Sequence, residues 1–238
     1  MKEEEKNHET TGKKTTLTDK IYQDIKDDIL TKVFQPGEKL NIKELAREYQ
    51  VSDTPVKQAL QRLAEEKLVV NTPNKGMSVR ALTPHELQDI FDMRLMMDTF
   101  FVKDIVTTLN YNHGLRQQLI DCLEAQKKFI ESNDSNHKPD EFFELDLEFH
   151  TLYLAASGNQ KAVNVFRDMQ PFTYASGTYL SQPHYRDCGC VEEHQAILDA
   201  ALASDLDALK AAVTAHLNNS RKALQLIFKV NQMIYPEN

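Results

Sequence analysis

Residues 36–69 read PGEKLNIKELAREYQVSDTPVKQALQRLAEEKLV, and this stretch decides the fold of the front of the chain. Asn41 can cap a short helix over residues 42–49, and Ser52 can cap a second helix that follows almost at once. Pro55 is tolerated in the first turn of the second helix because the backbone nitrogen there has no hydrogen bond to lose. Two short helices joined by a tight turn are typical of a helix-turn-helix.

Periodic apolar residues extend this motif on both sides. Upstream, apolar residues recur every fourth position from Leu17 to Val33, which predicts an amphipathic helix. Downstream, residues 68–71 and 77–80 can pair as strands across the turn-rich linker TPNKG. We therefore expect a winged helix-turn-helix domain over residues 17–82.

The remainder of the chain contains few helix breakers. Apolar residues fall at helical spacing through most of it, and only the patch 171–189 is looser. We expect six or seven helices in an antiparallel bundle over residues 83–230, so the fold class is mostly α. The polar residues 1–16 should form a disordered tail, and residues 231–238 a short C-terminal tail.

The net charge of −8 is unevenly distributed. Residues 17–82 carry eleven Lys and Arg against ten Asp and Glu, whereas the chain from residue 83 onward carries thirteen against twenty-two. A near-neutral front joined to an acidic remainder suggests two functions on one chain, with the front able to approach phosphates. We find neither an apolar run long enough for a membrane span nor a signal peptide, so we expect a cytoplasmic protein.

Three cysteines, Cys122, Cys188 and Cys190, are too few and too badly spaced for a disulfide framework. Their number fits a reducing compartment. The pair in Cys188-Gly-Cys190 is a weak metal or redox signal, because metal sites built on paired cysteines usually need two such pairs.

Four residues in separate segments are candidate metal ligands. Asp146 and His150, in DLEFH, are four apart and project from one face of a helix, so both can reach a single ion. His194 in EEHQAIL and His216 in TAHLNNS lie in two other helical stretches, and a bundle that turned all three helices inward would close an Asp-His-His-His set. The alternative is that the aspartate caps or pairs and that each histidine is an ordinary polar residue.

This donor set indicates a divalent transition metal as cofactor. Neutral imidazoles and one carboxylate suit zinc foremost, with nickel, iron and manganese as alternatives. Calcium and magnesium prefer shells made of oxygen alone.

A winged helix-turn-helix binds double-stranded DNA by laying its second helix in the major groove. The polar residues of that helix are Ser52, Thr54, Lys57, Gln58 and Gln61. Phosphates could be met from flanking positions by Lys43, Arg47, Arg62 and Lys75. The alternative is that these side chains are the solvated surface of a protein interaction module.

Residues 36–69, together with NKGMSVR at residues 74–80, resemble the winged-helix domain of the GntR family of bacterial transcription regulators. The second part of the chain is similar to the FadR branch of that family, whose helical ligand domain is called FCD. The residues that carry the resemblance are Pro36-Gly37, Leu45-Ala46, Val51-Ser52, Thr54-Pro55-Val56, Ala59-Leu60, Leu63, Gly76 and Val79, then Arg94, DLEFH, AASGN, EEHQAILDA and Ala215-His216-Leu217. The match runs from about Leu17 to Ile227.

The resemblance implies operator contacts position by position. The matching positions are Lys43, Ser52, Thr54, Lys57, Lys75 and Gly76. Family members typically carry arginine where this chain has Asp53, and commonly arginine and glutamate where it has Lys57 and Gln58. An arginine reads guanine with two hydrogen bonds, whereas a carboxylate can only accept one, for example from cytosine, and repels phosphates. We therefore expect an operator that differs from the usual family sequence, or a weaker affinity.

The resemblance also implies a sensor in the helical domain. Members of the FCD family have their metal ligands in the segments that hold Asp146, His150, His194 and His216. Open positions on an octahedral ion can take the carboxylate of a small effector, which Arg94 would help to bind. The alternative for Arg94 is a salt bridge with Asp98, four residues on.

The family further implies a homodimer that binds a palindromic operator, and repression is the commoner outcome in it. Residues 93–102 are rich in apolar side chains and are our candidate for the dimer surface; the alternative is that they belong to the core.

Two other function classes compete with a regulator. A metal-dependent hydrolase would need a base such as Glu144, Glu148, Glu192 or Glu193, but no motif sets one of these at a defined spacing from the ligands. A protein interaction adaptor with a purely structural metal would not respond to small acids. A DNA-reading domain would also be superfluous in an enzyme.

Overall fold

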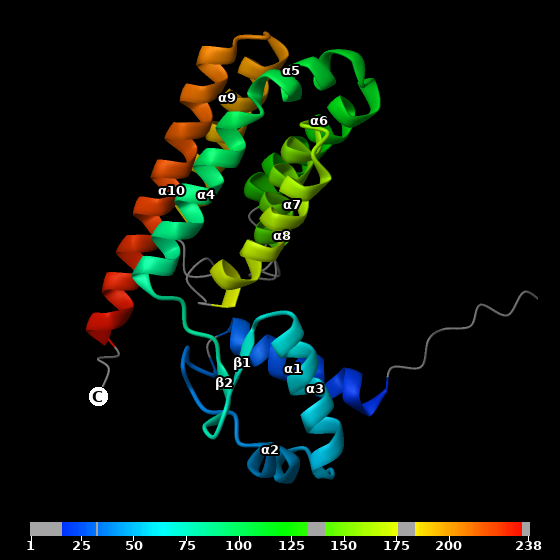
Figure 1. Ribbon diagram of the computed structural model, residues 1–238, viewed down its shortest axis with the longest axis vertical. Helices are drawn as coiled ribbons and strands as arrows, with labels where there is room; N and C mark the ends of the chain where they lie inside the picture. Colours follow the sequence, from blue (N-terminus) through cyan, green and yellow to red (C-terminus); the bar gives the residue numbers. More distant parts are fainter. Residues whose placement is uncertain (1–15, 32, 133–140, 176–183, 235–238) are drawn as a thin grey trace, which may run out of the picture.

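The computed structural model describes residues 16–31, 33–132, 141–175 and 184–234. The N-terminal head consists of α1 (Leu17–Leu30), α2 (Ile42–Glu48), α3 (Asp53–Glu65), β1 (Val69–Thr72) and β2 (Gly76–Val79). The bundle consists of α4 (Pro84–Phe100), α5 (Val102–Tyr111), α6 (His113–Ser132), α7 (Glu141–Ala155), α8 (Gln160–Ala175), α9 (His184–Leu202) and α10 (Leu206–Ile234). Head and bundle lie end to end (Figure 1), and the predicted fold class, a winged helix-turn-helix joined to a helical bundle, is confirmed. Of the two predicted tails, residues 1–15 and 235–238 lie outside the described residues.

The head folds around one apolar cluster shared by its helices. Ile21, Ile25 and Ile29 of α1, spaced four apart, are at most 1% exposed and pack in the same cluster as Val56 and Leu60 of α3. The helical spacing in the sequence therefore sets which faces of α1 and α3 meet.

The wing is an antiparallel hairpin in which Val69 lies opposite Val79 and Thr72 lies opposite Gly76. Both strands are displaced by one residue from the predicted ranges. The turn between them requires left-handed backbone at Asn74 (φ 62°) and Gly76 (φ 87°), which asparagine and glycine adopt at the least cost.

The bundle closes around a larger apolar cluster that draws residues from α4 through α10. α8 continues to Ala175 and α9 begins at His184, so both ends of the patch that we predicted to be looser are helical. The residues between them, 176–183, lie outside the described part of the chain. In the described residues, no helix combines the length and the apolarity needed to cross a membrane.

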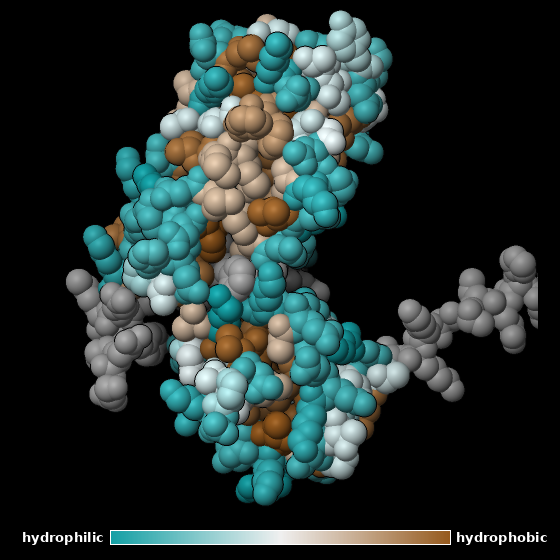
Figure 2. All heavy atoms as spheres, in the orientation of Figure 1, coloured by the Kyte–Doolittle hydropathy of each residue, from teal (hydrophilic) through white to brown (hydrophobic). Residues whose placement is uncertain are grey.

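Residues 93–102, the candidate dimer surface, divide between two environments. Met97 and Val102 are buried in the bundle core, so the core alternative holds for them. Met93, Met96 and Phe100 point outward and are 40%, 55% and 75% exposed. On the side of the molecule seen in Figure 2, an apolar strip flanked by hydrophilic residues lies in the region that α4 and its neighbours occupy in Figure 1.

The helix α7 belongs to both halves of the molecule. Its neighbouring residues Phe142 and Phe143 are each 4% exposed, but Phe142 packs in the bundle core and Phe143 packs in the core of the head. Leu147, one turn further along, contacts both cores. A second link joins Lys67 of the head to α8, where its Nζ donates to the backbone oxygen of Asp168 at 3.1 Å.

Candidate functional site

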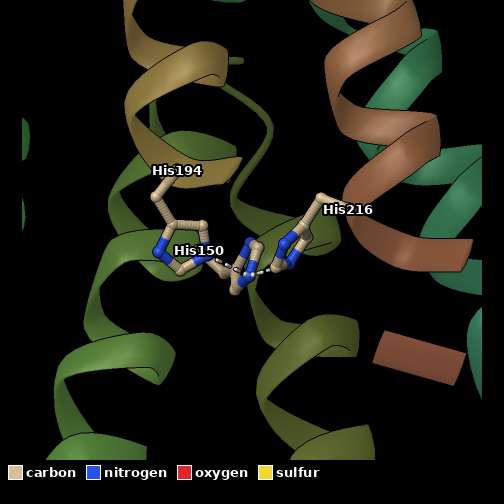
Figure 3. A group of neighbouring side chains, drawn as sticks. All are labelled: His150, His194 and His216. Atoms are coloured by element: carbon tan, nitrogen blue, oxygen red, sulfur yellow. Dashed lines mark hydrogen bonds between the residues drawn. The ribbon is translucent and has the colours of Figure 1, made fainter. Parts of the chain in front are cut away.

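Three imidazoles from three helices meet in the interior of the bundle (Figure 3). His150 projects from α7, His194 from α9 and His216 from α10, and none is more than 3% exposed. The Nε2 atom of His150 lies 3.3 Å from Nε2 of His194 and 3.1 Å from Nε2 of His216. The ring of Phe149 stacks on His194 with 4.1 Å between ring centroids, which holds that imidazole in one plane.

Hydrogen bonds to two neighbouring side chains fix which ring nitrogen carries the proton in His194 and in His216. The amide nitrogen of Gln126, on α6, donates to the backbone oxygen of Leu145 at 2.9 Å, so its Oε1 turns toward Nδ1 of His194 at 2.8 Å. Because an amide oxygen can only accept, Nδ1 carries the proton and Nε2 of His194 keeps its lone pair. Oε2 of Glu193 lies 2.9 Å from Nδ1 of His216 and has the same effect there.

Glu193 is itself held by hydrogen bonds. Nη2 of Arg186 donates to its Oε2 at 2.8 Å, and Nδ2 of Asn219 donates to its Oε1 at 2.8 Å. Burial raises the pKa of Glu193, but the hydrogen bonds from His216, Arg186 and Asn219 outweigh burial and lower it. Glu193, which we considered as a base for a hydrolase, is therefore an ionised group that orients His216.

Asp146 and Cys190 continue the donor set beside His194. Oδ1 of Asp146 lies 3.6 Å from Nε2 of His194 and 3.9 Å from Nε2 of His150. Cys190 precedes His194 by one turn of α9; its thiol donates to Oδ1 of Asp146 at 3.3 Å and lies 3.6 Å from Nε2 of His194. The structure thus brings the four expected residues into one cluster and adds a fifth donor atom, the Cys190 sulfur.

The chemistry of this donor set fits a divalent transition metal. With metal–nitrogen bonds of about 2.0–2.1 Å, two imidazole nitrogens in a tetrahedral shell lie about 3.3 Å apart. The measured separations from His150 are 3.3 and 3.1 Å. Since Nε2 of His194 and Nε2 of His216 both present lone pairs, one proton on His150 cannot serve both well, whereas a central cation would serve all three nitrogens.

Burial also sets the protonation of the cluster. Burial lowers the pKa of His150 and His194 well below 6.5, aided by Arg94 and by the neighbouring imidazoles. Neutral imidazole is the form that binds metals. Burial, followed by the negative charge of Asp146, raises the pKa of the Cys190 thiol well above its ordinary value, so the thiol keeps its proton when no cation is near.

Arg94 lies beside Asp98 on the inner face of α4. Its Nη2 is 3.4 Å from Oδ2 of Asp98, so the salt bridge that we gave as the alternative is formed. Within the described part of the chain, however, the buried atoms Arg94 Nε and Asp98 Oδ1 have no hydrogen-bond partner. Asp98 also borders a gap whose other walls include His150, Tyr153 and His216, and the gap is too tight to admit a water molecule.

The residues expected to contact DNA all lie on the head. Lys43 is on α2, Ser52 is the N-cap of α3, and Thr54, Lys57 and Gln58 follow on α3. Lys75 is in the turn of the wing and Gly76 is the first residue of β2, and all seven residues are exposed. The hydroxyl of Ser52 makes no capping hydrogen bond. Oε1 of Gln58 accepts a hydrogen bond from Thr18 of α1 at 3.3 Å, so one end of its amide is engaged within the protein.

Two charged residues of the head have structural partners. Arg62, which we expected to meet phosphates, donates instead to Asp19 of α1 at 2.6 Å and lies 4.1 Å from the centre of the Tyr22 ring. Asp53 stands in the first turn of α3, where a negative charge stabilises the helix N-terminus. This position gives Asp53 a physical role besides any contact with bases.

Three functional residues of the cluster, Gln126, Cys190 and Arg186, were not predicted from the sequence. Gln126 is fully buried in a helix face shared with Leu119 and Leu123, and an amide in such an apolar stripe is a signal for a buried polar partner. Cys190 is four residues before His194, the same spacing that singled out Asp146 and His150, but we weighed it only with Cys188. Arg186, which supports Glu193, carries no sequence signal that we recognise.

Comparisons with known proteins agree with this architecture. The family model for bacterial regulatory proteins of the gntR family matches residues 17–79, and the FCD domain model matches residues 89–219. The transcriptional repressor GlaR of Escherichia coli is 26% identical over 211 residues, which cover 82% of this chain and 90% of that protein. The E. coli repressor RspR is 25% identical over 225 residues, which cover 93% and 94%.

Solved structures show the same fold. E. coli McbR/YncC superposes with a TM-score of 0.65 at 19% identity and covers 90% of this chain and 99% of that one. Lar, which controls the expression of the Listeria monocytogenes agr system, superposes with a TM-score of 0.68 at 14% identity and covers 90% of this chain and 99% of that one. GlaR and RspR are transcriptional repressors by name, and the two family models match the two halves of this chain in sequence. The chain therefore belongs to the GntR family, in the FadR-like branch with an FCD domain, and is a DNA-binding transcription regulator, not an enzyme.

Proposed function

We propose that this regulator is a cytoplasmic repressor that binds its operator as a homodimer and changes its operator affinity when a small carboxylate binds at a metal ion in the bundle. The ligands would be Asp146, His150, His194 and His216. The observation that carries the proposal is the convergence of three buried Nε2 atoms. In His194 and His216 the hydrogen bond at Nδ1 fixes the tautomer, so that Nε2 presents its lone pair. GlaR and RspR are repressors by name, which supports repression.

A bound divalent ion would supply positive charge and coordination positions for an effector carboxylate. Zinc is our first expectation, with nickel, iron and manganese as alternatives. Arg94 offers the second anchor, because its buried Nε has no partner within the described residues. A guanidinium can hold a carboxylate with two parallel hydrogen bonds, and the single long contact to Asp98 leaves that capacity unused.

Effector binding would require the bundle to move. The gap beside Asp98, His150 and His216 cannot admit even a water molecule, so an acid can enter only if its walls separate. Asp98 is one wall of this gap and meets Arg94 through one contact of 3.4 Å, so a movement of Asp98 away from Arg94 would be one such change.

The helix α7 would carry this change to the head. Asp146 and His150 stand on the same helix as Phe143, which is embedded in the core of the head. A small rotation or shift of α7 at the metal would therefore move a side chain on which the head packs. An effector that binds one placement of the heads better than another shifts the population toward it and alters operator affinity.

On the DNA, α3 would lie in the major groove with its first turns against the bases, and the wing turn would approach the backbone. The contacts we propose are Lys43, Ser52, Thr54, Lys57, Gln58, Lys75 and Gly76. Asp53 predicts an operator that departs from the usual family sequence at the base pair nearest this carboxylate.

The dimer would form through the outward face of α4. Met93, Met96 and Phe100 recur at helical spacing and expose apolar surface that a second copy of the chain would cover. Phe100→Glu should convert the dimer to a monomer in light scattering, because it would bury a charge at the contact. Tyr111→Glu, an equally exposed aromatic position on α5, is the control and should leave the dimer intact.

The deciding experiment measures operator affinity by fluorescence anisotropy on DNA from upstream of the regulator's own gene. We expect sequence-specific binding that changes on addition of a small carboxylate and loses that response in chelator or in His194→Ala. His85→Ala, at an exposed histidine in a salt bridge on the surface, is the matched control. Absence of specific binding under every condition would refute the regulator mechanism proposed here, and binding that ignores both acids and chelator would favour a structural metal.

A further inference from the structure

Cys190 stands where a ligand of the same metal would stand. Its sulfur is buried between two expected ligands, 3.3 Å from Oδ1 of Asp146 and 3.6 Å from Nε2 of His194. It projects from α9 one turn before His194, so both side chains issue from one helix face toward one point.

These distances match the spacing of neighbouring ligand atoms on one metal ion. With a metal–sulfur bond of about 2.3 Å and metal–nitrogen or metal–oxygen bonds of about 2.0–2.1 Å, a sulfur lies about 3.6 Å from its neighbouring donors. The sulfur-to-nitrogen distance of 3.6 Å agrees with this, and the sulfur-to-oxygen distance of 3.3 Å is within a few tenths of an ångström. His150 adjoins this group through His194, since the Nε2 atoms of the two histidines lie 3.3 Å apart.

His194 belongs to two overlapping donor groups. One consists of His150, His194 and His216, and the other of Asp146, Cys190 and His194; in each group the donor atoms all lie within 4.8 Å of one another. The first group contains only imidazoles, and the second mixes sulfur, oxygen and nitrogen.

We propose that the Cys190 sulfur is a ligand of the metal ion in this bundle, so that the site prefers ions that accept a thiolate, such as zinc and cobalt, over manganese. The inference rests on the proposed metal centre and adds to it a ligand that changes the selectivity of the site. Soft thiolate ligands favour zinc-like ions, whereas manganese and magnesium favour carboxylate, carbonyl and water. Binding would release the thiol proton that Asp146 now accepts in a hydrogen bond.

The test uses cobalt(II) added to the full chain after removal of metal by chelator. A cobalt–thiolate bond produces a charge-transfer band in the near ultraviolet, which imidazole and carboxylate ligands do not produce. We expect this band in the wild type and in Cys122→Ser, which removes the other buried thiol. We expect it to disappear in both Cys190→Ser and Cys190→Ala, with circular dichroism to verify that each variant is folded.

A second measurement compares zinc and manganese in competition for the same site. In Cys190→Ser the ratio of zinc affinity to manganese affinity should fall about tenfold or more. Even the loss of a residue that only supports a ligand lowers metal affinity about tenfold, and Cys190 would be a ligand itself. Cobalt binding without the band, or a band that survives in Cys190→Ser, would overturn the assignment of Cys190 while leaving the metal centre intact. A wild type that binds no cobalt at all would overturn both.

Discussion

Replacing Gln126 by methionine should weaken metal binding through His194 without touching a ligand. Methionine keeps the length of the side chain but removes two hydrogen bonds, from His194 Nδ1 at 2.8 Å and to the backbone oxygen of Leu145 at 2.9 Å. The fully buried imidazole is then free to move its proton to Nε2, the atom that should bind the metal. Loss of such a partner typically lowers metal affinity about 10–100-fold, or about 1.4–2.7 kcal/mol.

The assay is a competition titration of zinc between the metal-free protein and a chromophoric chelator. Gln118→Met, on the exposed face of the same helix, should bind zinc like the wild type. Gln126→Glu should retain most of the affinity, because a carboxylate still accepts from Nδ1 of His194 and makes the imidazole more basic. Equal losses in the methionine and glutamate variants would mean that packing, not orientation of His194, is responsible, and no loss in Gln126→Met would refute the reasoning.

Two further outcomes follow from burial. In metal-free protein carrying Asp187→Asn, which removes a carboxyl whose pKa burial and Asp146 raise to about 7, the free energy of unfolding measured in urea should decrease as the pH falls from 7.5 to 5.5. The pKa values of His150 and His194 are lowered in the folded state, so the unfolded chain takes up protons first as the pH falls through 6.5. Each histidine should therefore lower the free energy of unfolding by about 1.4 kcal/mol over that interval, and Asp98, whose pKa burial raises, should offset part of this loss. A free energy of unfolding that rises toward pH 5.5 would contradict neutral burial of the two histidines. Phe143→Ala should destabilise the head by about 3–5 kcal/mol, whereas the adjacent Phe142→Ala should destabilise the bundle. Hydrogen exchange measured separately for the amides of each half would report the difference. Equal effects of each variant on both halves would contradict the division of the two cores.

The fold was predictable because local signals agree with the final packing. Isoleucines four apart fix the buried face of α1, and Asn41 begins α2 where its side chain accepts from the Lys43 backbone nitrogen. The beginning of α9 was less predictable. Gly189 and the preceding residues suggested a loose patch, but packing of Cys190 and Val191 in the core keeps the helix intact through them.

The site was predictable only where two ligands share a helix. The spacing of Asp146 and His150 indicates a shared face, but which other elements meet that face depends on packing between helices far apart in the chain. Gln126 reaches His194 across 68 positions of sequence, and a single sequence gives no measure of that distance. Arg94 shows a different limit, since its sequence allows both a salt bridge and an open guanidinium edge, and the structure contains both.

The position of Phe143 has a practical consequence for dissecting this regulator. A fragment that ends near residue 82 would lack one side chain of its own apolar core, and the surface that Phe143 covers would be exposed to water. Such a fragment should be less stable and more prone to aggregation than the same segment in the full chain. In chimaeras that exchange heads between members of the family, the phenylalanine of α7 would need to match the apolar residues of the new head that pack against it. The head is therefore not a self-sufficient module.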